Sequence, residues 1–310
     1  MNRHHWAVIL AGGDGVRLRS MTRAIAGDDR PKQFCPLVGE DALLTETRKR
    51  AALTVPTHRT LVVVNRAHER FYTPLLADLS APALVAQPEN RGTAPAILYA
   101  LLVLAGRQAG ADTVAFLPSD HYLSDNDTFM RQVEHAFDGC SLRPDLVTLL
   151  GIAPDRPEPG YGWIEPGEPV VGVSSGLREV RRFWEKPAAA EAERYRAQGW
   201  LWNSFVMVGR VSTLLALLRL AVPDLCRSFA GITPALGTVG EPPALERLYC
   251  GLPSVDFSRQ VLTARPDRLA VLPVRGVHWN DLGDPERVLA TRRRVHARST
   301  EDLLPVPIPA

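Results

Sequence analysis

Cysteine is scarce in this sequence, with only Cys35, Cys140, Cys226 and Cys250, and no CxxC pair occurs. Scattered thiols without metal-ligand spacing predict ordinary reduced cysteines of a cytoplasmic protein, not a disulfide framework or a zinc site. Long hydrophobic runs are also missing: none approaches the roughly 20 residues that span a bilayer, so we expect no membrane partner. The N-terminal residues lead into a short apolar stretch and then glycines, unlike a secretory signal.

An excess of charge of one sign is absent as well. Lysine and arginine number 36 against 34 acidic residues, a net charge of +2, which excludes a protein whose main role is to coat nucleic acid. Only three of the basic residues are lysines, namely Lys32, Lys49 and Lys186. A bias toward arginine codons accounts for this in general. Against that background, a retained lysine can mark a place where a compact ammonium is needed.

The composition is otherwise that of a globular protein. The chain has 310 residues, with 45% hydrophobic and 23% charged residues, which allows one large domain or two ordinary ones with a sizeable core. In the first half, short β-branched runs alternate with helical patterns. Strands are predicted at 7–10, 60–64, 83–86 and 113–117, and helices at 93–108 and 127–137, with Thr93 capping the first of these helices.

This alternation predicts an α/β fold of Rossmann-like type, a mostly parallel sheet with helices on both faces and ligands beyond the carboxyl ends of the strands. The second half is less regular. Strands at 146–152, 177–184 and 204–208, a turn at 160–162, and helices at 188–197 and 211–220 predict an integrated substrate-binding lobe that folds onto the first sheet. We divide the chain into a catalytic domain at 1–290, with halves at about 1–125 and 126–290, and a poorly ordered tail at 291–310.

A glycine-rich loop follows the first predicted strand, with the sequence LAGGDGVRL from Leu10 to Leu18. Glycines allow positive φ and let several backbone N–H groups point into one concavity, which suits phosphate oxygens. The dinucleotide pattern GxGxxG fails because Leu18 stands three residues after Gly15. The Walker pattern also fails because the sequence contains no Gly-Lys pair.

The loop and the segment RPKQF at 30–34 together resemble the signature of the sugar-1-phosphate nucleotidyltransferases, and within these the mannose-1-phosphate guanylyltransferases. The resemblance continues through QPENRGTAPA at 87–96, PSDH at 118–121, GYG at 160–162, EKP at 185–187, WNS at 202–204 and WNDLG at 279–283. It implies transfer of a nucleotidyl group from an NTP, GTP being favoured, to a sugar 1-phosphate, mannose 1-phosphate being favoured.

Both reactants are anionic, and a sugar phosphate is already ionised near pH 7, so catalysis should consist of positioning and charge neutralisation. Arg17 suits the β- and γ-phosphates, and Lys32 suits the α-phosphate. The resemblance assigns Asp120 and Asp281 to Mg²⁺, an ion that prefers few protein carboxylates together with phosphate oxygens and water. We interpret His121 as structural or as a hydrogen-bond partner at the sheet edge.

The same resemblance makes the integrated lobe of the second half a sugar-binding lobe, and it also implies further binding residues. Those expected at the nucleotide are Leu10, Ala11, Gly12, Gly13, Gly15, Arg17, Gln87, Thr93 and Ser119. Guanine needs an acceptor for its N1 and N2 hydrogens and a donor for O6. Those expected at the sugar phosphate are Gly162, Glu185, Lys186 and Asn203, because a carboxylate and an amide match sugar hydroxyls and an ammonium pairs with phosphate. Trp202 is interpreted as a core residue.

The sequence departs from the family pattern at several points. The loop between Arg17 and Lys32 is longer than is usual in the family, and Asn90-Arg91-Gly92 stands where the order Gly-Arg-Asn is commoner. The match to the family pattern also weakens at 255–258. We expect no isomerase-type cupin domain and no oligomer built through a β-helical extension, and leave a homodimer open. Two alternatives remain: the same chemistry with glucose 1-phosphate and UTP or dTTP, and a non-catalytic nucleotide-sugar-binding regulatory protein.

Overall fold

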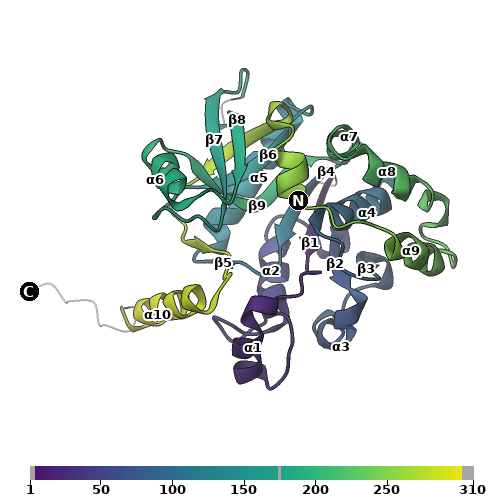
Figure 1. Cartoon of the computed structure of the whole chain (residues 1–310), viewed down its shortest axis with the longest axis horizontal. Coiled ribbons are helices and arrows are strands. Elements are labelled where there is room, and N and C mark those ends of the chain that lie inside the picture. Colours follow the sequence, from purple (N-terminus) through teal and green to yellow (C-terminus); the bar gives the residue numbers. More distant parts are fainter. Residues whose placement is uncertain (1–3, 174–175, 302–310) are drawn as a thin grey trace, which may run out of the picture.

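A large mixed sheet forms the centre of the computed structural model, which describes residues 4–173 and 176–301 (Figure 1). Within these residues the sheet has nine strands in the order β3-β2-β1-β4-β9-β6-β10-β8-β7. Their bounds are β1 (His5–Leu10), β2 (Thr60–Asn65), β3 (Leu84–Gln87), β4 (Thr113–Pro118), β6 (Val147–Ile152), β7 (Gly162–Pro169), β8 (Arg178–Glu185), β9 (Leu201–Arg210) and β10 (Leu269–Val274).

The helices lie around this sheet. They are α1 (Arg19–Ala26), α2 (Leu43–Ala52), α3 (Glu69–Tyr72), α4 (Thr93–Gly106), α5 (Asn126–Leu142), α6 (Ala189–Ala197), α7 (Val211–Ala221), α8 (Pro223–Ala230), α9 (Glu241–Cys250) and α10 (Pro285–Glu301). No helix in the described ranges is both long and apolar enough to cross a membrane. Within those ranges, all four cysteines are free.

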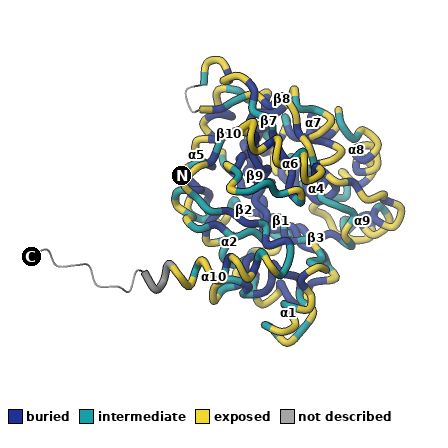
Figure 2. The backbone as a smooth tube through the Cα atoms, turned by 60° about the vertical axis from the view of Figure 1, so that its left-hand side comes forward, coloured by how far each residue is buried: buried dark blue, intermediate teal, exposed yellow. Residues whose placement is uncertain are grey.

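Both faces of the sheet are covered by helices, because side chains that point to opposite faces of β1 are both apolar and buried. Val8 packs in a cluster with residues of α4, α7, α8 and α9, whereas Ile9 packs in a second cluster with residues of α2, α3 and α5. Successive side chains of a strand point to opposite faces, so a strand covered on both sides is apolar throughout. Figure 2 shows the result, with buried strands inside and exposed helix surfaces outside.

The Rossmann-like α/β class is confirmed, and its parallel part lies in the first half. Strands β1, β2, β3 and β4 pair in parallel, and so do β6 and β10. The pairings of β9 with its neighbours and of β7 with β8 are antiparallel, which joins the second half to the same sheet. The first-half strands occur within a residue or two of their predicted positions.

Three local predictions were wrong. Thr93 does not cap α4: Gly92 occupies the N-cap with no side-chain cap, and Thr93 is the first helical residue. Gly162 is not in a turn but begins β7. The chain beyond Arg292 continues as helix α10 through Glu301, where poor order was predicted, and Thr291 is buried; residues 302–310 lie outside the described part. The composition of this segment is mostly polar, but the buried side chains of Val288 and Thr291 hold the first turns of the helix against the rest of the protein.

Candidate active site

The glycine loop leaves the carboxyl end of β1 and is fixed by a side chain from the RPKQF segment. The amide Nε2 of Gln33 donates to the carbonyl oxygens of Ala11 at 3.1 Å and Gly13 at 2.7 Å. Gly15 has φ of +58°, and a Cβ there would lie 3.0 Å from the backbone nitrogen of Lys32. The loop therefore packs directly on the segment that carries Lys32, and only glycine fits at the contact.

A cavity of about 330 Å³ opens beyond the carboxyl ends of the parallel strands, where ligands bind in sheets of this type. Its lining includes six residues predicted for the nucleotide or the metal: Leu10, Gly12, Gly13, Gln87, Thr93 and Asp120. It also includes Asn90, Phe205 and Asp256, which were not among the predicted binding residues.

Two predicted nucleotide residues have hydroxyls engaged with the backbone. The Thr93 hydroxyl oxygen accepts a hydrogen bond from the backbone N–H of Phe257 at 2.8 Å. The Ser119 hydroxyl donates to the carbonyl of Leu10 at 2.8 Å and joins the ends of β4 and β1. Thr93 still lines the cavity, whereas Ser119 is buried beside it.

A small second sheet brings the two predicted metal ligands together. Strands β5 (Tyr122–Leu123) and β11 (Trp279–Asn280) pair antiparallel, with Asn280 opposite Tyr122. Because Asp120 comes just before β5 and Asp281 just after β11, this register carries both carboxylates to the same end of the pair. The sequence offered no signal for this pairing, since each strand has only two residues.

Lys32 joins both aspartate segments. Its Nζ lies 3.1 Å from Asp120 Oδ2 and donates to the backbone carbonyls of Asp281 at 2.5 Å and Leu282 at 3.2 Å. The side chain is only 11% exposed. Lys32, Asp120 and Arg17 also line a pocket of about 200 Å³ beside the glycine loop, with Arg17 exposed at its rim on the 3-10 turn Val16–Leu18.

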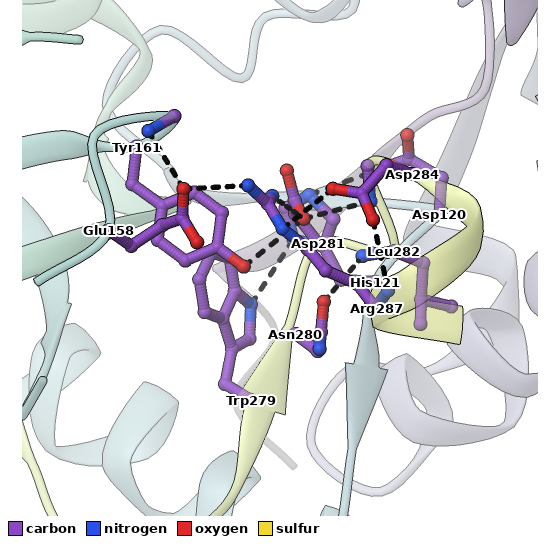
Figure 3. A network of polar contacts seen from close by, with 12 residues as sticks. Asp120, His121, Glu158, Tyr161, Trp279, Asn280, Asp281, Leu282, Asp284 and Arg287 are labelled. Atoms are coloured by element: carbon purple, nitrogen blue, oxygen red, sulfur yellow. Dashed lines mark hydrogen bonds and ion pairs between the residues drawn. The ribbon is translucent and has the colours of Figure 1, made fainter. Parts of the chain in front are cut away.

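The Asp281 carboxylate is held by Arg287, which lies outside the quoted motifs, and by Tyr161 and Gly283, which lie within two of them (Figure 3). Its Oδ1 accepts hydrogen bonds from Arg287 Nη1 at 2.8 Å, from the backbone N–H of Gly283 at 2.9 Å and from the Tyr161 hydroxyl at 3.2 Å. Arg287 in turn pairs with Glu158 at 2.7 Å. Arg287 lies on α10, in the segment adjoining the predicted tail, so no motif drew attention to it.

The electrostatics keep both aspartates ionised. Burial by itself would raise the pKa of each carboxyl, but the positive charge of Lys32 and, for Asp281, of Arg287 outweighs burial, so the net shift is downward. His121 accepts a hydrogen bond from the Trp279 indole at Nδ1, and its Nε2 faces Asp120 at 3.5 Å. Among the described residues, no group of three or more His, Cys, Asp or Glu forms a metal site.

The predicted sugar residues also converge, on β7, β8 and β9. A Cβ at Gly162 would lie 2.8 Å from Glu185 Oε2 and 3.3 Å from Asn203 Cβ, so the three residues are in contact. Lys186 is half-exposed, with its Nζ 3.6 Å from Glu185. Burial raises the pKa of Glu185 above its ordinary value. Trp202 is buried, as predicted.

Comparisons with known proteins show which family this chain resembles in sequence and fold. The family model described as nucleotidyl transferase matches residues 6–297. The xanthan biosynthesis protein XanB of Xanthomonas campestris is 36% identical over 284 residues, which cover 89% of this chain and 57% of that protein. A mannose-1-phosphate guanylyltransferase of Klebsiella pneumoniae is 31% identical over 286 residues, again 89% of this chain and 57% of that protein.

A solved structure, described as mannose-1-phosphate geranyltransferase from Thermus thermophilus, superposes with a TM-score of 0.79 at 29% identity. The superposition covers 93% of this chain and 79% of the chain in that structure. The chain spans little more than half the length of the curated relatives it matches. Since the family model covers nearly all of the sequence and the motif residues converge on one site, the chain belongs to the nucleotidyl transferase family.

Proposed function

We propose that this chain transfers a nucleotidyl group from an NTP, GTP in the first place, to a sugar 1-phosphate, mannose 1-phosphate in the first place. The observation that carries the proposal is the ammonium of Lys32, which is joined to Asp120 and to the backbone of Asp281 beside the glycine loop. The names of the relatives, which include mannose-1-phosphate guanylyltransferase, support the choice of substrates.

The reaction needs no general base. An oxygen of the sugar phosphate attacks the α-phosphorus of the NTP, a new P–O bond forms, and the bond from that phosphorus to the bridging oxygen breaks. Its electron pair leaves with pyrophosphate, and the products are the nucleoside diphosphate sugar and pyrophosphate. Repulsion between two polyanions opposes this approach, so pre-placed positive charge and orientation supply the rate enhancement.

Arg17 and Lys32 supply that charge. The exposed guanidinium of Arg17, at the rim of the pocket that Lys32 also lines, is placed to contact the β- and γ-phosphates. Lys32 would exchange its contact with Asp120 for an α-phosphate oxygen and keep its two carbonyl acceptors. The glycine loop, held open by Gln33, adds backbone N–H groups.

The family implies a divalent metal, and the donor set fits Mg²⁺. Two ionised carboxylates stand at one end of the β5–β11 pair. The hydrogen bonds that Asp281 accepts within the described residues all go to Oδ1, which leaves Oδ2 available to a metal ion. Asp120 and Asp281 would hold the ion, which when bound neutralises phosphate charge. Arg287 and Tyr161 keep the Asp281 carboxylate in one orientation.

The sugar would bind between Gly162, Glu185 and Asn203. Glu185 accepts hydrogen bonds from hydroxyl groups when ionised, and Asn203 offers its amide N–H₂ because its Oδ1 already accepts from the backbone of Phe205. Gly162 leaves room for the sugar to approach the backbone. Lys186, with 51% of its side chain exposed, can reach the phosphate of the sugar.

The test is pyrophosphate release, measured with magnesium across a matrix of NTPs (GTP, UTP, dTTP, ATP) and sugar 1-phosphates (mannose, glucose). The proposal expects release only when both substrates are present, and fastest with GTP and mannose 1-phosphate. Faster release with glucose 1-phosphate and UTP or dTTP would keep the reaction and change the substrates. Saturable binding without release would favour a regulatory protein.

A further inference from the structure

Gln87, at the end of β3 on the floor of the nucleotide cavity, is tied to a residue far along the chain. The hydroxyl of Tyr249, on α9, donates to Gln87 Oε1 at 3.0 Å. Both side chains are buried, with Tyr249 fully enclosed and Gln87 2% exposed. Figure 1 shows α9 next to β3, so that Gln87 and Tyr249 are in contact although they lie 162 residues apart in the sequence.

The direction of this hydrogen bond determines the orientation of the amide. Burial raises the pKa of Tyr249, so its hydroxyl stays protonated and needs an acceptor. Gln87 Oε1 is its acceptor among the described residues. If the amide were reversed, its N–H₂ would face the hydroxyl, and the buried phenol hydrogen would lose that acceptor, a costly arrangement in a buried site.

With Oε1 turned to Tyr249, Gln87 Nε2 is turned to the glycine loop. A Cβ at Gly12 would lie 3.0 Å from this nitrogen, and both residues line the cavity. In the part of the chain that the structure describes, Nε2 donates to no protein acceptor. The cavity therefore presents a hydrogen-bond donor at this point.

We propose that Tyr249 is a positioning residue for base selection: it holds the Gln87 amide so that the cavity offers a donor to the base, which favours a purine with a carbonyl oxygen at position 6 over one with an amino group there. This inference rests on the proposed function, because it concerns the same NTP. It adds a residue on α9 that lies outside every motif discussed above.

The experiment compares GTP with 2,6-diaminopurine riboside triphosphate, which keeps the 2-amino group of GTP and replaces its O6 by an amino group. The readout is the ratio of kcat/KM for the two nucleotides with saturating mannose 1-phosphate. In Tyr249→Phe the aromatic ring, which packs against Phe229, is retained, and only the hydroxyl is lost. We expect the preference for GTP to fall about tenfold or more, mainly through KM, because the amide is free to reverse.

Tyr99→Phe is the matched control. Tyr99 is likewise a buried tyrosine, and its hydroxyl donates to Glu241 on the same helix α9, whereas no hydrogen bond joins it to Gln87 among the described residues. Both variants remove one phenolic hydrogen bond of α9, so both should lose some thermal stability. Only Tyr249→Phe should change the nucleotide ratio. A general structural role for Tyr249 predicts similar ratios in the two variants, and that result would overturn the inference.

Gln87→Glu provides an independent test if Tyr249→Phe does not fold. One carboxylate oxygen would still accept from Tyr249, and the other would present an acceptor to the cavity. The preference should then shift toward the diaminopurine nucleotide. An unchanged ratio would contradict the inference while leaving the transferase proposal intact, whereas absence of pyrophosphate release from the unaltered protein with every NTP would contradict the transferase proposal itself.

Discussion

Replacing Lys32 by arginine keeps the charge and changes its shape. The ammonium has three acceptors, two carbonyls and one carboxylate, within 3.2 Å. A planar guanidinium on a longer stem cannot point donors in these three directions from one atom. If one charge-assisted hydrogen bond is lost, the free energy of unfolding should fall by about 2 kcal/mol. For a chain of this size, that corresponds to a decrease in Tm of about 3 °C.

Activity should suffer more than stability. Lys32 must contact the α-phosphate at a defined place, and a displacement of about 1 Å in such a contact costs about a hundredfold in rate. Pyrophosphate release by Lys32→Arg, measured at saturating substrates, should therefore fall by about that factor. Lys49→Arg is the control, because Lys49 is 60% exposed and pairs with Asp41 at the surface. Activity of Lys32→Arg within about threefold of the unaltered protein would show that the site does not need a compact ammonium at this position.

Three further predictions follow from the site. Asp281→Asn should abolish turnover with little change in Tm, since the amide oxygen can still accept from Arg287; near-normal turnover would remove this carboxylate from catalysis. Gly12→Ala should raise KM for the NTP about tenfold, because its Cβ would meet Gln87 Nε2 at 3.0 Å, and an unchanged KM would show that the cavity does not hold the base. Burial raises the pKa of Glu185, so KM for the sugar 1-phosphate should rise as pH falls through that pKa. Glu185→Gln should show a raised KM that no longer varies with pH in this range. The Glu185→Gln variant should also have a higher free energy of unfolding at neutral pH, because the unaltered protein pays for keeping a buried carboxylate ionised there. If KM of the variant still depended on pH, the titrating group would be a residue other than Glu185.

The first half of the fold could be predicted from the sequence because its strands are apolar on both faces. A run such as 60–64 is buried by helices on either side, and a strand of this kind is visible without any knowledge of its partners. The convergence of Gly162, Glu185 and Asn203 was also expected, through resemblance. Their actual contact depends on antiparallel pairing among β7, β8 and β9, which the irregular second half did not reveal.

The residues that support the site could not be predicted in the same way. Arg287 is one of 33 arginines, and only the packing of α10 places it against Asp281. Tyr249 lies in an ordinary amphipathic helix, and its role depends on the approach of α9 to β3. The prediction that Thr93 caps α4 was wrong, because Gly92 occupies the N-cap and the Thr93 hydroxyl accepts a hydrogen bond from the backbone of Phe257, which is distant in sequence. Contacts over such separations leave no local pattern.

In the proposed reaction, one charged centre built on Lys32, Asp120 and Asp281 directs attack on the α-phosphorus. The most direct measurement follows GTP labelled at the α-phosphate in one reaction and at the γ-phosphate in another, with mannose 1-phosphate and magnesium. If the sugar phosphate attacks the α-phosphorus, the α label enters a nucleoside diphosphate sugar and the γ label enters pyrophosphate, in equal amounts. Recovery of the γ label as inorganic phosphate, with the α label remaining in a nucleoside diphosphate, would contradict it.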